Sequence, residues 1–238
     1  MIDFCESAGV PVQRRTASSY AQTPEGVDAV LKEHATARRF GLATRLVGEL
    51  DVPFPSTVAV ALDDQAQFDP MDVLTALAAD FRAAGGTLVQ GVRALGMRAT
   101  APVQVRTSAG PVTGDRAYLL TGAPILDRGL YLAKRAALRS SAIAFRTDAV
   151  IDGRYLSVDE PSRSVRDAES EGERRLLVGG NGHLVGRRPV TSEAVEDLIA
   201  WTRRSFPGAE PVAQWSAHDY QPFHRVPFVG WLPRVCGR

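Results

Sequence analysis

The chain has 238 residues, of which 45% are hydrophobic and 23% are charged, values that are ordinary for a globular protein. A formal net charge of +1 argues against a strong electrostatic attraction to nucleic acid or to an anionic membrane. The longest apolar run, residues 117–126, is shorter than the roughly 20 residues that a membrane-spanning helix needs. Because only Cys5 and Cys236 are present, near opposite ends of the chain, we expect no disulfide framework and a cytoplasmic location.

The first sixty residues predict a strand, a helix and a loop. Residues 13–20 have the pattern of a strand. Residues 24–41 predict an amphipathic helix, because Val27 and Val30 fall on one side of it. The prolines in residues 52–55 then predict a loop.

A second helix is predicted from Pro70 to the glycine pair at 85–86. The Asp69 carboxylate can accept hydrogen bonds from the free amides of the first turn. Pro70 occupies the first helical position, where its missing N–H costs nothing. Apolar residues recur at helical spacing from Leu74 to Phe81, and the glycines end the helix because glycine tolerates the left-handed cap conformation.

The chain after this helix changes to the period of strands. Residues 87–92 and 103–107 are rich in β-branched residues and predict two strands, with a tight turn at 108–110 after the second. The compact apolar run at 117–120 predicts a strand that is buried on both faces. It leads into the small-residue turn at 121–124.

The second half of the chain predicts further strands, at residues 141–147, 155–158 and 174–180. Between 161 and 175 the chain is dense in charge, which by itself is typical of a solvated hairpin loop. The glycine cluster at 179–186 predicts a turn at a strand end. Its spacing is not G-x-G-x-x-G and no helix pattern follows it, so it does not predict a phosphate-binding loop.

A last helix is predicted to begin after Thr191 or Ser192, either of which can cap it, and to end at residues 206–208. Two short patterns come after it. Residues 215–220 read W-S-x-x-D-Y, and residues 226–230 read V-P-x-x-G.

Composition offers little support for metal or hydrolytic chemistry. The four histidines lack paired metal-ligand spacing, so we expect no metal site. Ser216, His218 and Asp219 include the residue types of a catalytic triad, but neighbours on one segment rarely converge as nucleophile, base and orienting group. We therefore expect no triad.

The order of these elements resembles the D-amino-acid-oxidase-like group of FAD-dependent oxidoreductases, which contains amine and amino-acid oxidases. The resemblance rests on the Asp69-capped helix, the strands after it, the turn at 121–124 and, most specifically, the patterns at 215–220 and 226–230. Members that carry a Rieske iron–sulfur domain after the flavin module are especially similar. The chain lacks the family's G-x-G-x-x-G start and the end of its FAD site, and is therefore interpreted as truncated at both ends.

The resemblance implies an α+β fold. An incomplete FAD/NAD(P)-binding Rossmann-like domain, an α/β remnant, is expected beside an antiparallel-sheet substrate domain with flanking helices. Residues 1–67 and 125–214 are expected to form the two parts of the substrate-side domain. Residues 68–124 are expected to form the middle of the FAD-binding domain, to which residues 215–238 return.

The resemblance also implies site residues. Four are expected to contact FAD, through backbone or close approach: Val92, Thr121, Gly122 and Gly230. Three are assigned to the substrate pocket: Arg166, His183 and Trp215. Arginine suits such a pocket because its guanidinium can bind a carboxylate in a bidentate manner. No catalytic residue is assigned, because in this chemistry the cofactor accepts the hydride while the protein orients the substrate.

Two functions remain open. The first is an FAD-dependent oxidoreductase of the amine or amino-acid oxidase type, which transfers hydride from a C–N bond to flavin. Its partners would be a small amine or amino-acid-like substrate and a complementing nucleotide-binding polypeptide, since these 238 residues alone are not expected to be competent. The second is a non-catalytic remnant or binding module without flavin. Neither predicts a nucleic-acid or membrane partner.

Overall fold

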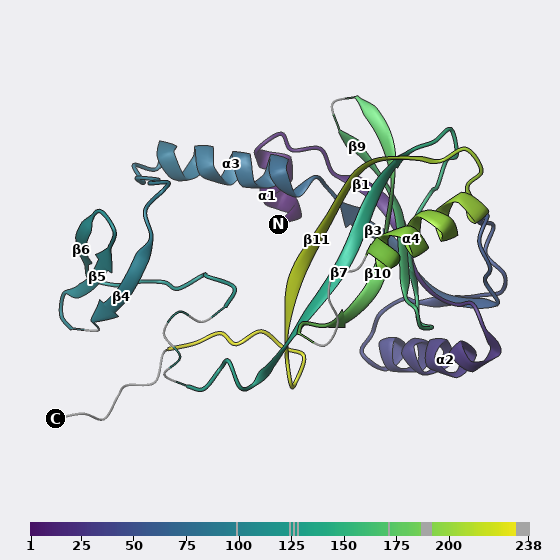
Figure 1. Cartoon of the computed structure of the whole chain (residues 1–238), viewed down its shortest axis with the longest axis horizontal. Helices are drawn as coiled ribbons and strands as arrows, with labels where there is room; N and C mark the ends of the chain where they lie inside the picture. The colour runs from purple at the N-terminus through teal and green to yellow at the C-terminus, as the bar shows by residue number, and fades with distance from the viewer. Residues whose placement is uncertain are drawn as a thin grey trace. The chain divides into compact units, whose positions relative to one another are not determined.

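The computed structural model describes residues 1–98, 100–123, 125, 127, 129–170, 172–186 and 192–231. Figure 1 shows its helices and strands coloured along the chain. Their order is α1 (Ile2–Ser7), β1 (Gln13–Ala21), α2 (Pro24–Arg39), β2 (Arg45–Val47), β3 (Val58–Gln67), α3 (Pro70–Ala83), β4 (Ala94–Arg98), β5 (Val103–Thr107), β6 (Gly110–Gly114), β7 (Arg135–Arg146), β8 (Arg154–Ser157), β9 (Arg163–Ser170), β10 (Glu173–Leu184), α4 (Ser192–Ser205) and β11 (Glu210–Pro222).

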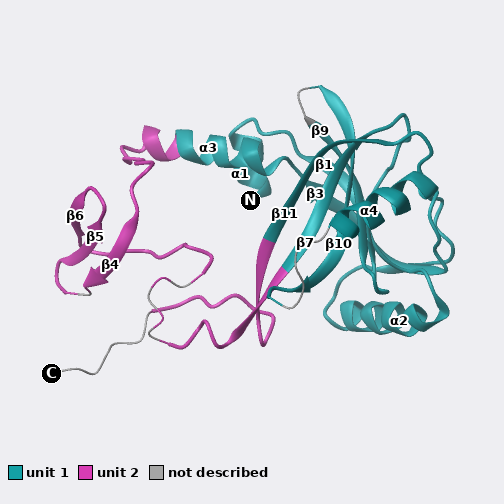
Figure 2. Cartoon of the chain, viewed as in Figure 1, with its two compact units in different colours: residues 1–79, 139–217 teal, residues 80–138, 218–238 magenta. Residues whose placement is uncertain are grey.

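The chain divides into two compact units, which Figure 2 shows in different colours. Unit 1 consists of residues 1–79 and 139–217, and unit 2 of residues 80–138 and 218–238. The units are groups of residues in mutual contact. The assignment of residues 1–67 and 125–214 to a substrate-side domain, and of the rest to a nucleotide-binding domain, stays a prediction.

A mixed sheet of eight strands dominates unit 1, in the order β11-β7-β10-β9-β8-β1-β3-β2. β1 is antiparallel to β3 and parallel to β8, while β8, β9 and β10 are joined by antiparallel pairing. Strands far apart in sequence thus become neighbours at the centre of the sheet. A second, three-stranded antiparallel sheet, β4-β5-β6, belongs to unit 2.

Helix α4 covers one face of the large sheet. Leu198 and Trp201 of α4 belong to the main core cluster, together with Tyr20 of β1 and Val165 of β9. Phe54 lies in the same cluster, with its ring centroid 5.2 Å from that of Tyr20 and 5.6 Å from that of Trp201. Burial of these large apolar side chains is the main stabilisation of unit 1.

Helix α2 packs on the opposite face, near one end of the sheet. Val30 of α2 is fully buried against Ala21 of β1 and Val60 of β3. Along a strand the side chains alternate between faces, so Ala21 and Val60 point away from the face of their neighbours Tyr20 and Ala59. The remaining part of this face, beyond α2, is not covered by α4.

Helices α1 and α3 meet in a small separate cluster, in which Cys5, Val10 and Val73 are buried. The other large apolar side chains of α3, which include Leu74, Leu77 and Phe81, are exposed, and Leu74 has 57% of its surface accessible. None of the described helices is long and apolar enough to span a membrane.

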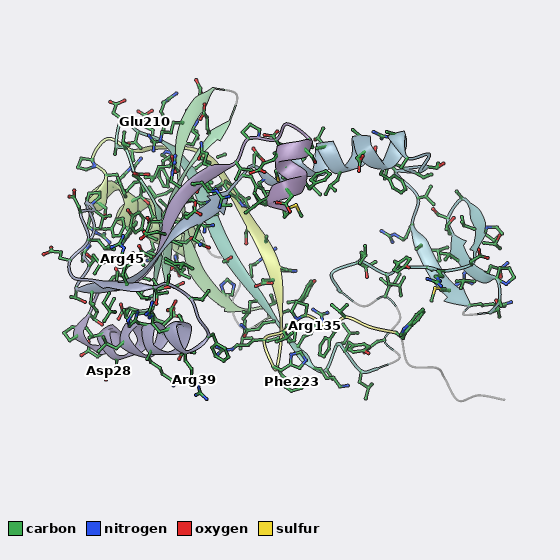
Figure 3. All side chains as sticks on the ribbon, turned by 180° about the vertical axis from the view of Figure 1, so that it is seen from behind. Asp28, Arg39, Arg45, Arg135, Glu210 and Phe223 are labelled. Atoms are coloured by element: carbon green, nitrogen blue, oxygen red, sulfur yellow. The ribbon has the colours of Figure 1, made fainter. Side chains whose placement is uncertain are left out.

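Unit 2 is organised differently, because none of its described residues is buried. Its contacts are surface contacts, such as the stacking of the Arg135 guanidinium 3.9 Å from the ring centroid of Tyr220. The Tyr131 and Phe228 rings lie 4.9 Å apart between centroids. Figure 3 labels Arg135 among the side chains of the chain.

The predicted helices at 24–41, at 70–84 and after 191 are confirmed as α2, α3 and α4. The proposed cap of α3 is also confirmed, because the Met71 amide donates a hydrogen bond of 2.8 Å to the Asp69 carboxylate. Thr191, the alternative cap residue of α4, lies outside the described residues. The short helix α1 was not predicted.

Two predicted strands are wrong. Residues 87–92 and 117–120 have no regular secondary structure, and Leu120 is 92% exposed instead of buried. A strand is stable only when a neighbouring strand accepts its hydrogen bonds, and the described residues provide none beside these segments.

Two predicted turns or loops are strands. The charged segment between 161 and 175 contains β9, and the glycine cluster from 179 lies inside β10 as far as Leu184. The negative charge of the buried Asp167 in β9 is compensated, because Asp167 forms ion pairs with Arg15 and Arg174.

Candidate active site

The uncovered face of the large sheet carries a concavity with a volume of about 560 Å³, formed entirely by unit 1. Its lining comes from β1, β3, β7, β8, β9, β10 and β11, with one side provided by α2 and the chain just after it. Pairing in the sheet explains why these residues meet. Ala17 pairs with Arg154, Ser19 with Leu156, and Leu156 with Ser164, so their side chains share one face.

Small residues leave the space of the concavity open. Ser164 and Gly179 are cross-strand partners, and a Cβ atom at position 179 would lie only 2.6 Å from the Ser164 hydroxyl oxygen. Ala17 and Ala142 also line the concavity. Larger side chains at these positions would fill the space that a ligand needs.

Two arginines provide the positive charge of the concavity. Arg154 of β8 and Arg166 of β9 are direct cross-strand partners, and both line it. The described part of the chain contains no salt bridge to either guanidinium. Burial lowers the pKa of the Arg166 guanidinium from its ordinary value, and the like charge of Arg154 lowers it further, while Asp167 and Asp69 oppose the shift.

Several other arginines of unit 1 are paired with carboxylates. The Arg45 Nε atom lies 3.0 Å from Asp63, and the Arg146 Nη2 atom 2.7 Å from Glu210. The hydrogen bonds from these arginines lower the pKa of the Asp63 and Glu210 carboxyl groups. Arg45 and Glu210 are labelled in Figure 3, and neither lines the concavity.

One carboxylate lies in the concavity, on α2. Glu33 accepts a hydrogen bond of 2.8 Å from the Ser19 hydroxyl group. Ser19 is two residues along β1 from Ala17, the partner of Arg154, which is a separation of roughly 6–7 Å along the strand. The concavity therefore has a positive region at β8 and β9 and a negative group beside α2.

A buried network behind β9 holds the strand in register. The Asp167 carboxylate is 2.7 Å from the Arg174 guanidinium and accepts a hydrogen bond of 3.2 Å from the Gln67 amide. Asp167 alternates with Arg166 along the strand, so the network lies on the opposite face from the concavity. It fixes the backbone from which Arg166 projects.

Two of the three predicted pocket residues line the concavity, namely Arg166 and Trp215. His183, the third, does not; its Nδ1 atom lies 3.0 Å from the Asn181 carbonyl oxygen in β10. The assignment of all three to a substrate pocket stays a prediction. Sequence reasoning did not single out Arg154 or Glu33.

The four residues predicted to contact FAD all belong to unit 2. Val92 is exposed, and the Thr121 hydroxyl group donates a hydrogen bond of 2.7 Å to the Ala123 carbonyl oxygen. Gly122 and Gly230 have φ angles of +66° and +153°, which favour glycine. Their contacts with FAD stay a prediction.

The described residues lack the features that hold the diphosphate of FAD. A Cβ atom at Gly122 or Gly230 would meet no other atom within 4 Å, so neither glycine marks a close approach of backbone segments. The 238 residues contain no G-x-G-x-x-G sequence, whose amides and following helix hold a diphosphate. The described residues by themselves therefore do not form a cradle for FAD.

The described residues contain no group of three or more histidine, cysteine and acidic side chains that could hold a metal ion. Cys5 is a buried free thiol. The polar chemistry of the concavity thus comes from Arg154, Arg166, Glu33 and neighbouring hydroxyl groups.

The α+β fold is shared with the solved structures of a glycine oxidase and an L-proline dehydrogenase. Glycine oxidase from Geobacillus kaustophilus superposes with a TM-score of 0.80 and 18% identity, over 99% of this chain and 67% of that one. L-Proline dehydrogenase from P. horikoshii superposes with a TM-score of 0.71 and 13% identity, over 93% of this chain and 64% of that one. At such identities the likeness concerns the fold alone.

Sequence comparison assigns the family. The family model described as DAO, FAD dependent oxidoreductase, matches residues 2–237, so the chain belongs to the DAO family of FAD-dependent oxidoreductases. The putative Rieske 2Fe-2S iron-sulfur protein YhfW of Bacillus subtilis (strain 168) is 27% identical over 215 residues. The matched region is 89% of this chain and 42% of that protein, so the chain spans less than half the length of this relative.

Proposed function

We propose that these residues form the substrate-side portion of an FAD-dependent oxidoreductase that oxidises the C–N bond of an amine or amino acid. The observation that carries the proposal is the concavity on the uncovered sheet face, which Arg166 lines together with apolar residues such as Leu156 and Trp215, in a fold shared with glycine oxidase. The similar solved structures include a glycine oxidase and the amino acid oxidase NikD, and membership of the DAO family supplies the class of cofactor.

In this proposal the chain binds and orients the substrate. Arg166 binds the substrate carboxylate, because a planar guanidinium in a partly desolvated site gives two parallel hydrogen bonds. Leu156 and Trp215, which also line the concavity, exclude water from the bound molecule. Removal of water strengthens the ionic contacts of Arg166, since the local dielectric constant falls.

The FAD diphosphate is proposed to be held by residues outside these 238, either on the same polypeptide or on a complementing nucleotide-binding polypeptide. The exposed apolar residues of unit 2 support this idea, because surfaces of this kind normally mark an interface. Val92, Thr121, Gly122 and Gly230 would then contribute only secondary contacts to FAD. A cytoplasmic location is inferred from the two cysteines, of which Cys5 is free.

The second candidate function is a binding module of the same family that carries no flavin. The absence of G-x-G-x-x-G from the 238 residues favours it, since that motif supplies several charge-assisted hydrogen bonds to the diphosphate. In this case the concavity would bind an anionic small molecule without oxidising it.

The test begins with the coding DNA on both sides of the 238 codons, where an in-frame G-x-G-x-x-G is expected upstream or in an adjacent gene. The chain is then produced together with that segment, and flavin absorbance of the purified protein is measured. Anaerobic addition of amino acids should bleach the flavin, and Arg166→Gln should weaken this response while leaving the flavin bound.

A control uses Arg204→Gln, which removes one positive charge from α4, on the other face of the sheet. Its flavin content and bleaching should match those of the unchanged protein. A protein that retains no flavin, with or without the added segment, would refute the oxidoreductase and leave the binding module.

A further inference from the structure

We propose that the concavity of unit 1 recognises a molecule with two carboxylates, and that Arg154 binds the second of them. The inference rests on the proposed function, in which Arg166 binds the first carboxylate. It assigns a substrate class, a dicarboxylic amine or amino acid, and it makes Arg154 a specificity-determining residue.

The arrangement of the two guanidiniums carries the inference. Arg154 and Arg166 are directly opposite each other in the β8–β9 ladder, so their Cβ atoms are roughly 4.5–5.5 Å apart and on the same face. Both line the concavity and both are partly buried. Two guanidinium groups that start so close can each reach one carboxylate of a short molecule.

Like charges directly opposite each other in a sheet are destabilising. Other arginines of β9 and β10 are compensated: Arg163 lies 2.5 Å from Asp197, and Arg174 lies 2.7 Å from Asp167. By contrast, no salt bridge within the described residues joins a carboxylate to Arg154 or Arg166. Two anionic groups of a ligand would remove the repulsion between the two guanidinium groups.

The only carboxylate among the residues lining the concavity does not neutralise the pair. Glu33 is bonded to Ser19, and no salt bridge within the described ranges joins it to Arg154 or Arg166. It lies on the α2 side of the concavity, where it can face a cationic amino group. A positive pair and a separate carboxylate thus match a molecule with two carboxylates and one ammonium group.

The test is isothermal titration calorimetry of the purified 238-residue chain at constant ionic strength. Succinate is compared with butyrate, which has the same number of carbon atoms and one carboxylate. We expect succinate to bind at least about tenfold more tightly, since one extra charge-assisted hydrogen-bonded contact contributes that much. Glutarate and pentanoate repeat the comparison at a greater separation of the carboxylates.

Variants test whether Arg154 causes the preference for succinate over butyrate. Arg154→Gln should reduce the ratio of the succinate and butyrate affinities to within about twofold, by weakening succinate alone. Arg154→Lys keeps the charge and should restore part of the ratio. Arg166→Gln should weaken both ligands, whereas Arg204→Gln should change neither. Circular dichroism and thermal unfolding confirm that each variant is folded before its affinities are compared.

Several results would overturn the inference. These are equal binding of succinate and butyrate, a preference that survives Arg154→Gln, equally tight binding of sulfate, or binding of neither carboxylate. If succinate and butyrate bind equally, while the protein contains flavin and oxidises amines, the dicarboxylate preference is refuted and the proposed function stays intact. Absence of flavin would refute the proposed oxidation even if succinate is preferred.

Discussion

Unit 1 and unit 2 use apolar residues in opposite ways. In unit 1 the β-sheet, α2 and α4 bury Tyr20, Phe145 and Leu198 completely. In unit 2 no described residue is buried, and Tyr118 and Trp231 are 78% and 89% exposed. A monomeric protein seldom exposes so many large apolar side chains without a binding role.

The difference shows which unit can form a core from its own residues. Unit 1 contains a large paired sheet with helices packed on it, so its main core is built from its own residues. Unit 2 contains many large apolar side chains, such as Tyr118, Leu120 and Trp231, but buries none of its described residues. We infer that its apolar residues are selected for a surface that another segment covers, in keeping with the proposed nucleotide-binding partner.

The sharpest comparison between the units is the truncation of one phenylalanine in each. Phe145→Ala in the core of unit 1 should lower the free energy of unfolding by about 3–5 kcal/mol, because the lost burial is joined by the cost of a cavity. Phe223→Ala in unit 2 should change it by less than about 0.5 kcal/mol, because Phe223 is exposed. Urea unfolding followed by circular dichroism measures both.

Equal destabilisation by Phe145→Ala and Phe223→Ala would contradict the contrast between the units. It would mean that unit 2 has a core of its own in solution. Trp201 is buried in the main cluster, whereas Trp215 and Trp231 are exposed, so the blue-shifted part of the tryptophan emission reports the unit 1 core and separates its loss from a local change in unit 2.

The second prediction concerns the polar support of unit 1. The buried Arg163 guanidinium donates hydrogen bonds to Asp197 and Asn181, at 2.5 and 2.8 Å. Asp197→Asn should lower the free energy of unfolding by about 1–3 kcal/mol, because a buried charge loses its anionic partner. Chemical unfolding at neutral pH provides the measurement.

Asp63→Asn is the matched control for Asp197→Asn. It also removes a carboxylate bound to an arginine, Arg45, but both side chains are exposed, and exposed pairs contribute little. A loss from Asp63→Asn as large as that from Asp197→Asn would show that burial does not decide the strength of these ion pairs.

The third prediction concerns the buried hydroxyl group of Tyr20, which has no hydrogen-bond partner among the described residues. Tyr20→Phe should raise the free energy of unfolding by about 1 kcal/mol, because it removes an unsatisfied buried polar group. Thermal unfolding of the two proteins at neutral pH tests this value. A destabilised Tyr20→Phe variant would indicate that the hydroxyl group has a partner in solution.

The same substitution should change stability in alkali. Burial raises the pKa of the Tyr20 hydroxyl above its ordinary value, and the nearby Asp159 carboxylate adds to the shift, while Arg163 opposes it. The folded protein therefore holds the proton more tightly than the unfolded chain. Stability from this group is complete below about pH 10 and falls as the pH rises above that value. Tyr20→Phe should lose less stability in that range, as unfolding at a series of alkaline pH values would reveal.

The smallest effect on stability is expected at Leu120. Leu120→Asp should leave the free energy of unfolding within about 0.5 kcal/mol of that of the unchanged protein, because the side chain is exposed.

The 238-residue chain alone should self-associate through its exposed apolar residues, and Leu120→Asp should reduce the association. Light scattering over a range of concentrations measures it, with Thr113→Asp, at an exposed and already polar position of unit 2, as control. A monomer at high concentration without any substitution would contradict the idea of an uncovered surface.

The sequence predicted helices more reliably than isolated strands. Asp69, Pro70 and the apolar spacing after them determine α3 locally, because a helix satisfies its hydrogen bonds within one segment. The apolar residues at 117–120 indicate burial but not the partner that provides it. This segment was therefore predicted as a strand, while in the described residues Leu120 is exposed.

The candidate site shows the same division. Arg166 and Trp215 were singled out from the resemblance, and both line the concavity. Arg154 carries no distinctive sequence pattern, because its importance comes from its cross-strand pairing with Arg166. The charge of β9 also gave a misleading prediction of a loop, since the compensating Arg15 and Gln67 come from strands that lie one hundred or more residues before Asp167.

The sequence alone determined the family, the α+β class and the position of each long helix, since these depend on motifs, composition and spacing within a segment. Tertiary structure alone decided which face of the sheet remains open and which charged residues meet on it. The physical reason is that strand pairing joins residues distant in the chain, and only that pairing brings Arg154 opposite Arg166 and leaves them without a carboxylate partner among the described residues.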